Sequence, residues 1–387
     1  MKETRHFIFF DSGFRPFFLL ATGFSIVAVV LWMMIWSGLW TLNSPFKPTD
    51  WHIHEMLFGF SSAVIAGFLL TAIPNWTGRA QIRDRFLAFL VALWIAGRIA
   101  VLGAIPLPIS WVLVIDNSFL AVLCLVAAHQ LLVSHNWRNL TVVALVCLFL
   151  CANVAFHQEA MISGAADYSR RAGMAVLILL IMLIGGRIIP SFTRNWLVKQ
   201  GVTCLPTQFN RYDALSLGIA VLSLVMWVSK APPTITAIAL SVAAIIHVIR
   251  LQRWQGGRAW RSAILLMLHL SYLCIPVGFA FLALALIWNG MSAAAGLHVL
   301  GMGAIGGMTT AVMLRASMGH TARPLAAGAT LSLAFAVILL AAILRAMLPG
   351  MWIFGLSGIQ ISAILWVGGF GIICIRIWPW LVMPRVD

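Results

Sequence analysis

Charged residues are scarce in this sequence: Asp, Glu, Lys and Arg make up only 9% of the 387 residues, whereas 62% are hydrophobic. Soluble domains carry about 25% charged residues, so this shortage excludes a water-soluble enzyme. Acidic residues are the scarcest, with 10 Asp and Glu against 25 Lys and Arg, which gives a formal net charge of +15. The basic residues lie in short loops between apolar runs. We therefore interpret them as signals of membrane topology and expect no nucleic acid as a partner.

Cysteine is also sparse, and a cleavable leader is missing. The six cysteines are scattered, without the spacing of a metal site or of a disulfide framework. We expect them to be small, buried apolar residues. Residues 1–15 are polar and basic, and the apolar run that follows is long enough to form a span. No cleavable signal peptide is therefore predicted.

Long apolar runs, in contrast, recur from one end of the chain to the other. Each has about 20 residues, the length that crosses a bilayer as a helix. They predict an all-α, polytopic membrane protein of twelve transmembrane helices, in which residues 1–387 form a single integral membrane domain. The predicted helices cover residues 17–40, 52–74, 86–104, 110–133, 139–160, 170–189, 213–229, 233–250, 263–288, 293–314, 324–346 and 354–375.

The distribution of Lys and Arg predicts the direction of these helices. Alternate loops carry 19 basic residues on one side and five on the other. Basic residues favour the cytoplasmic side, so both termini are expected to be cytoplasmic. Similar short motifs contain Thr77, Thr193 and Thr321, near the ends of the second, sixth and tenth helices. These matches suggest a threefold repeat of four helices.

Two histidines near the outer ends of predicted helices are candidate ligands of haem iron. Ionisable groups are costly inside a membrane and are therefore candidates for function. His54 lies close to the start of the second helix, and His298 lies five residues after the start of the tenth. Two imidazoles on facing helices are a common way to hold a b-type haem from both sides. Glu55 could orient an imidazole, or it could only favour a helix N-terminus.

Arg98 and Asp116 are expected at similar depths in the third and fourth helices. The rise of a helix places both about 10 Å below the outer surface. We predict an intramembrane ion pair between them. Arg98 alternatively contacts a carboxylate of the cofactor.

Further histidines were considered as metal ligands. His52 is two residues from His54, about 200° around a regular helix, so the two rings cannot easily bind one ion. His247, His269 and His320 are candidates for a second metal site on the inner side, which needs at least two of them. His157, at the end of the fifth helix, is expected to face water.

Five segments of the sequence resemble motifs of the NnrS family, and together they span residues 13–321: GFRPFF at 13–18, WHIHEMLFG at 51–59, IPNWTGR at 73–79, GGRIIP at 185–190 and RASMGHT at 315–321. The resemblance implies a multi-pass protein of the bacterial inner membrane that contains haem and copper. It also implies a link to nitric oxide metabolism or nitrosative stress in denitrifying cells. The metal ligands named above come from their positions in the sequence and not from this resemblance.

A remoter likeness is to the catalytic subunits of haem–copper oxidases, which also have twelve spans and haem ligands on the second and tenth. This chain departs from them. The predicted seventh helix contains no histidine, and the sixth lacks the His-x-x-x-Tyr pattern of the oxidase copper centre. Oxygen reduction of that type is therefore not expected.

The sequence thus predicts an inner-membrane protein that binds heme b, with copper as a second cofactor, and acts on nitric oxide or a nitrosyl species. Its activity would be that of a haem-dependent oxidoreductase, with an electron donor that the sequence does not identify. The alternative is a twelve-helix transporter of copper, haem or a small anion. Pro74, Pro190 and Pro276 could then mark broken helices. A purified protein without a Soret absorbance would favour the transporter.

Overall fold

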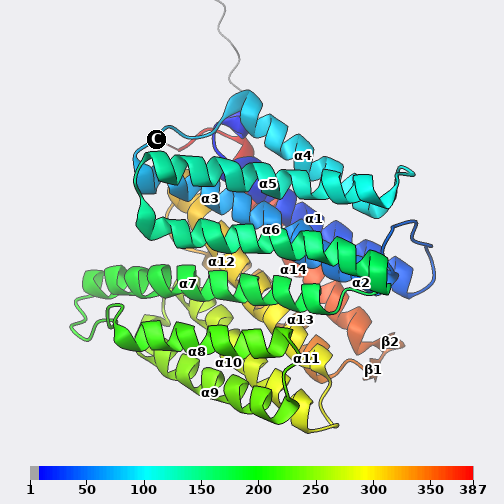
Figure 1. Ribbon diagram of the computed structural model, residues 1–387. Coiled ribbons are helices and arrows are strands. Elements are labelled where there is room, and N and C mark those ends of the chain that lie inside the picture. The colour runs from blue at the N-terminus through cyan, green and yellow to red at the C-terminus, as the bar shows by residue number, and fades with distance from the viewer. Residues whose placement is uncertain (1–7, 387) are drawn as a thin grey trace, which may run out of the picture. The chain divides into compact units, whose positions relative to one another are not determined.

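The computed structural model describes residues 8–386, and most of these residues are helical. Twelve helical stretches in this part of the chain are long and apolar enough to cross a membrane, which confirms the predicted all-α, twelve-span architecture. Ten of the spans are single α-helices, labelled in Figure 1: α1 (Phe14–Trp36), α4 (Asp84–Leu102), α5 (Ile109–Val133), α6 (Trp137–Ser163), α7 (Tyr168–Lys199), α8 (Arg211–Val228), α9 (Pro233–Gln252), α10 (Ala263–Ile287), α13 (Gly328–Met347) and α14 (Gly358–Val382).

The second and tenth spans differ from the others because a π-helical segment interrupts each of them. A π turn holds an extra residue and is frequent at functional sites. Each π segment directly follows a histidine, His54 or His298, and the same number of residues separates these histidines from Thr77 and Thr321. The two spans consist of α2 (Pro48–His54), the π segment Glu55–Phe60 and α3 (Ser61–Thr77), and of α11 (Ala293–His298), the π segment Val299–Gly306 and α12 (Gly307–His320). The second and tenth spans thus share this break, whereas α7 is α-helical throughout, and the threefold repeat remains a prediction.

The α7 helix is longer than the sequence predicts. The prediction ended it at residue 189, because proline usually terminates a helix. Instead, Pro190 lies inside α7, which continues to Lys199. Membrane spans tolerate proline because hydroxyl side chains and neighbouring helices satisfy the backbone groups that it leaves unpaired. Three residues after Pro190, the Thr193 hydroxyl donates a hydrogen bond to the carbonyl of Ile189, at 2.8 Å, within the continuing helix.

The helices group into two compact units, described here separately. The first contains the described residues up to Gly173 together with 316–324 and 370–386, and the second contains Met174–Arg315 and Leu325–Gly369. In the first unit, α4 packs against α5, α1 packs against α3, and α5 lies beside α6 (Figure 1). The core of this unit is aromatic: Phe17, Phe58 and Phe156 are almost completely buried. This core encloses the polar centre described in the next subsection.

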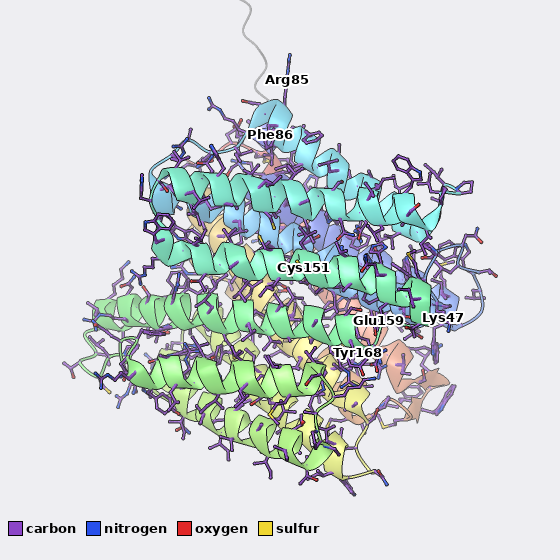
Figure 2. All side chains as sticks on the ribbon, viewed as in Figure 1. Lys47, Arg85, Phe86, Cys151, Glu159 and Tyr168 are labelled. Carbon is purple, nitrogen blue, oxygen red and sulfur yellow. The ribbon has the colours of Figure 1, made fainter. Side chains whose placement is uncertain are left out.

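The surface of the spans in the first unit is apolar, with polar groups near the helix ends. Leu125 of α5 and Leu148 of α6 are 70% and 54% exposed in the middle of their helices, as expected of side chains that face lipid. Near the end of α6, Glu159 accepts hydrogen bonds from the backbone nitrogens of Tyr168 and Ser169, at 2.9 and 2.8 Å. These contacts cap the start of α7, where Figure 2 shows Glu159 and Tyr168 close together.

In the second unit, α9 packs along α10 and α8 packs along α9. Large side chains such as Trp254, Tyr272 and Phe279 are buried among these helices. A short antiparallel pair, β1 (Trp352–Ile353) and β2 (Leu356–Ser357), precedes α14. This unit holds two of the predicted metal ligands, His269 and His298.

Candidate metal centre

His54 lies at the junction of α2 and the π segment Glu55–Phe60, and none of its surface is exposed. Gly59 lies in the same π segment, and because it has no side chain, Arg98 and Glu55 can lie close to its backbone. A Cβ atom on Gly59 would lie 2.7 Å from Nη1 of Arg98 and 3.2 Å from Oε2 of Glu55. The wide turn and the missing side chain therefore allow Arg98 to approach the second span closely.

Both ring nitrogens of His54 face oxygen acceptors from other side chains. Its Nδ1 lies 2.9 Å from Oε1 of Glu55. Its Nε2 lies 3.1 Å from Oδ2 of Asp116 on α5 and 2.9 Å from Oδ1 of Asn153 on α6. The contact with Glu55 fits the first of the two roles considered for this residue, that of orienting an imidazole.

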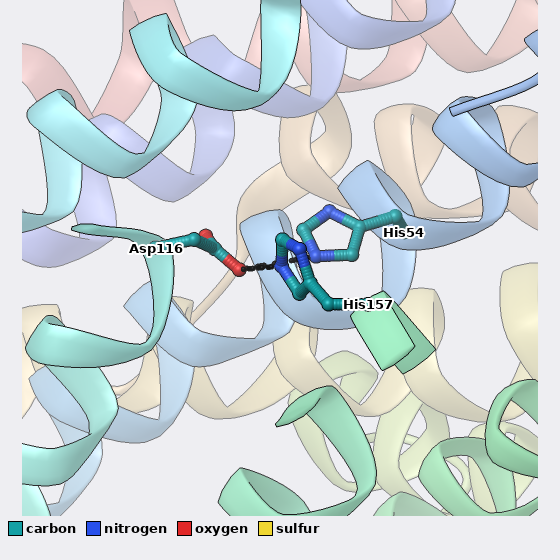
Figure 3. Close-up of side chains that lie close together, drawn as sticks. All are labelled: His54, Asp116 and His157. Carbon is teal, nitrogen blue, oxygen red and sulfur yellow. Dashed lines mark hydrogen bonds and ion pairs between the residues drawn. The ribbon is translucent and has the colours of Figure 1, made fainter. Parts of the chain in front are cut away.

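His157 reaches the same carboxylate from α6. Its Nε2 lies 2.9 Å from Oδ2 of Asp116, so two imidazoles converge on one oxygen atom, as Figure 3 shows. The expectation that His157 faces water is wrong, because its side chain is completely buried. The predicted helix ended at residue 160, whereas α6 continues to Ser163, which places His157 more than a turn inside the helix.

Arg98 completes the centre as its only cation of fixed charge. It forms ion pairs with Oδ1 of Asp116 and, at 2.5 Å, with Oε1 of Glu55. These contacts confirm the predicted pair of Arg98 with Asp116 and add a second carboxylate. Two carboxylates and one guanidinium leave one negative charge in excess. The centre therefore requires one more positive charge, from a proton or a metal ion, to be neutral in its buried setting.

The donor atoms of His54, Asp116 and His157 fit a metal ion. One nitrogen of each imidazole and one carboxylate oxygen lie within 4.8 Å of one another, and all three residues are buried. Bonds of about 2.0–2.2 Å to an ion would separate adjacent ligands by roughly 3 Å, which is close to the distances between these donors. Asn153 adds a fourth oxygen next to His54, so the set is two nitrogens and two oxygens. Such a set suits Cu(II), Zn(II) or non-haem iron more than a soft Cu(I) site built from sulfur.

One ring nitrogen of His157 is unpaired. Its Nδ1 is buried and has no hydrogen-bond partner among the described residues. If Nε2 donates to Asp116, the lone pair of Nδ1 is left unsatisfied. If Nδ1 carries the proton instead, the lone pair of Nε2 faces a carboxylate oxygen, and a cation between Nε2 and Oδ2 would remove that conflict. Nδ1 stays unpaired in both states, so the case for a metal ion depends on the convergence of the three donors.

The other predicted site residues lie outside this cluster. In the first unit, the His52 ring stacks on Trp32 at 4.6 Å, and the His320 ring lies 5.4 Å from that of Phe14. In the second unit, Nδ1 of His298 lies 2.7 Å from the carbonyl oxygen of Ala294. The predicted partnership of His54 with His298 in haem binding remains a prediction.

His269, also in the second unit, makes the same type of local contact as His298. Its Nδ1 lies 2.9 Å from the carbonyl oxygen of Leu265, one turn earlier in α10. A backbone contact of this type fixes a proton on Nδ1 and directs the lone pair of Nε2 outward, as metal-binding histidines require. Both histidines therefore have the tautomer of a ligand.

Sequence reasoning missed two members of the centre, His157 as a ligand and Asn153 altogether. The signal was present, because an Asn and a His four residues apart share one face of a helix. In an apolar run, such a polar pair indicates a common buried partner.

These observations define the class of the protein: it is a multi-pass membrane protein with a possible metal site buried in its first unit. The profile of the family described as NnrS protein matches residues 8–385, and the chain therefore belongs to the NnrS family. A comparison with curated proteins gave no match.

Proposed function

We propose that this protein is a membrane metalloprotein of nitric oxide metabolism, with a transition metal ion bound by His54, His157 and Asp116. The observation that carries the proposal is the convergence of two imidazole nitrogens and a carboxylate oxygen, all buried and within 4.8 Å of one another. The link to nitric oxide comes from the resemblance to the NnrS family. The inner membrane of a bacterium is the expected location.

Copper is the metal that agrees best both with the ligands of this site and with the cofactors that the resemblance to the NnrS family implies. Imidazole nitrogen and carboxylate oxygen are ligands that Cu(II) accepts well. When bound, copper would supply one-electron redox chemistry. His54, His157 and Asp116 would hold the ion, and Asn153 would offer a further oxygen. Arg98 and Glu55 would orient the set, because Arg98 fixes one oxygen of Asp116 while Glu55 fixes the ring of His54.

Of the two histidines that the sequence predicts as haem ligands, His298 fits this role better than His54. An axial ligand of haem needs room for the macrocycle beside its ring nitrogen, and side-chain oxygens lie 2.9–3.1 Å from both nitrogens of His54. In His298, Nδ1 contacts a backbone carbonyl, and this contact directs the lone pair of Nε2 away from the helix, where it suits iron. When bound with an open coordination position, haem iron would supply the capture of nitric oxide. We therefore assign haem to His298 and copper to the first unit.

A transporter is the second candidate, and one observation favours it. The second and tenth spans are interrupted at corresponding places, next to His54 and His298. Interrupted helices at matching positions are typical of substrate sites in transporters. The buried charges around Arg98 would then bind and release a cation.

The two candidates differ in what the purified protein retains. We expect the protein, extracted in detergent, to contain copper by mass spectrometry and to show a Soret band that shifts when nitric oxide is added to the reduced form. A Soret band without a shift would reject capture by haem. Protein without a Soret band, which loses its metal on dialysis, would favour transport. Protein that never retains a metal would reject the metal centre.

A further inference from the structure

The second unit contains a buried polar chain that the proposed metal centre does not use. It consists of Asp213 on α8, His247 and Arg250 on α9, and Tyr272 on α10, and each of them has at most 3% of its surface exposed. Four such groups within membrane spans are costly to bury and therefore are candidates for function. Their hydrogen bonds determine where Tyr272 and His247 carry their protons.

The direction of these bonds follows from Arg250, which can only donate. Its Nε donates to Oδ1 of Asp213 at 2.9 Å, and its Nη1 donates to the Tyr272 oxygen at 2.8 Å. The hydroxyl of Tyr272 must then donate its own proton to Nδ1 of His247, at 2.9 Å. His247 therefore carries its ring proton on Nε2, which lies 3.2 Å from the carbonyl oxygen of Ser216, an obligate acceptor.

This arrangement prepares His247 to receive the phenolic proton. After such a transfer, both N–H groups of the imidazolium would have acceptors: the oxygen of Tyr272 and the carbonyl of Ser216. Asp213 lies 2.9 Å from Arg250 and 3.5 Å from Arg253, and its negative charge lowers the cost of a further cation at His247. The buried Trp254 ring lies 4.6 Å from that of Tyr272 and covers one side of the phenol. Trp254 is itself an aromatic side chain that can be oxidised.

We propose that Tyr272 is a redox-active tyrosine with His247 as its proton acceptor. One electron leaves the phenol for a one-electron oxidant, an oxidised transition metal ion, while the phenolic proton moves from Tyr272 to Nδ1 of His247. The products are a neutral tyrosyl radical, a protonated His247 and the reduced metal ion. Return of one electron and of the proton restores the starting state. The test uses an external oxidant, so its outcome is independent of the metal centre in the first unit.

The other tyrosines provide matched controls, because the chain has only three. Tyr168 is 50% exposed at the start of α7. Tyr212 donates its hydroxyl proton to the carbonyl of Ile246, at 2.9 Å. A carbonyl oxygen is a poor base, so Tyr212 has no group in this contact that takes up its proton.

The variant Tyr168→Phe/Tyr212→Phe retains Tyr272 as its single tyrosine and leaves the buried chain intact. We expect flash oxidation with a photogenerated ruthenium(III) complex to give a tyrosyl radical signal in electron paramagnetic resonance, in this variant as in the wild type. Ring-deuterated tyrosine should narrow the signal. Pulsed measurements in D₂O should also detect an exchangeable proton at the radical oxygen. A variant without the signal, or a signal without this proton, would overturn the proposal.

His247→Gln tests the proton acceptor, since glutamine accepts a hydrogen bond but does not take up the proton. We expect the radical to form roughly 100-fold more slowly, as is typical when a positioned base is lost. A purely structural role of His247 predicts an unchanged rate in folded protein. Formation of the radical at the wild-type rate in His247→Gln would therefore also overturn the proposal.

Discussion

Nε2 of His157 lies 2.9 Å from Oδ2 of Asp116, and the two residues come from consecutive helices, α6 and α5. Both side chains are completely buried. This contact converts the expected ion pair of Arg98 and Asp116 into part of a larger centre. Asp116 accepts from the guanidinium through one oxygen and faces two imidazoles through the other. One carboxylate thus organises residues of α2, α4, α5 and α6.

His157→Ala should remove the metal of the first unit. Loss of one imidazole leaves a single strong nitrogen donor, and we expect metal retention after dialysis to fall by at least about tenfold, the lower bound for loss of even an indirect contact to a metal. Metal content per chain by mass spectrometry measures the effect. His135→Ala, at an exposed residue next to α6, is the control. Equal metal contents in the two variants would contradict the assignment.

Arg98→Ala should destabilise the protein more than the double change Arg98→Ala/Asp116→Ala. The single variant leaves buried carboxylates without their cation, which costs about 3–5 kcal/mol. The double variant removes one of these charges as well. Thermal unfolding in detergent, compared between the two variants without added metal, tests this order. Equal unfolding midpoints in the single and the double variant would mean that Arg98 and Asp116 do not stabilise the protein by their interaction.

Gly59→Ala should lower thermal stability, because the added Cβ would meet Nη1 of Arg98 at 2.7 Å. Such overpacking costs about 1–3 kcal/mol. Gly23→Ala in α1 is a matched control, since no atom lies within 4 Å of the Cβ it would add. Alanine is favoured over glycine inside a helix by about 1 kcal/mol, so the control should be neutral or more stable. A Gly59→Ala protein as stable as Gly23→Ala would show that the close approach of Arg98 is not needed.

His298→Ala should abolish the Soret band, whereas His129→Ala, at an exposed position of α5, should preserve it. The reason is that His298 has the ligand tautomer, with Nδ1 bonded to the carbonyl of Ala294 at 2.7 Å. The ratio of Soret to protein absorbance measures haem content. Full haem content in His298→Ala would refute the assignment of His298 as the haem ligand. If His54→Ala lost haem and His298→Ala did not, His54 would be the ligand instead.

Much of the architecture follows from composition, because apolar length alone defines a membrane span. The pairing of Arg98 with Asp116 is also predictable, because the fixed rise per residue of a helix puts both residues at the same depth in the membrane. Hydropathy does not reveal where a helix ends when polar residues are buried, and this explains the error at His157. The π segments after His54 and His298 depend on backbone packing and have no sequence pattern of their own. The spacing of Asn153 and His157 indicates a shared face of a helix, but the sequence does not show that Asp116 of α5 lies opposite that face.

The number of imidazoles bound to the metal tests the central claim most directly. X-ray absorption at the copper edge, on purified protein loaded with Cu(II), counts these rings through their characteristic outer-shell scattering. We predict two imidazoles in the wild type, and one in His157→Ala when enough Cu(II) is supplied to fill the weakened site. A spectrum with sulfur ligands, or one that is the same in both proteins, would contradict a metal centre formed by His54, His157 and Asp116.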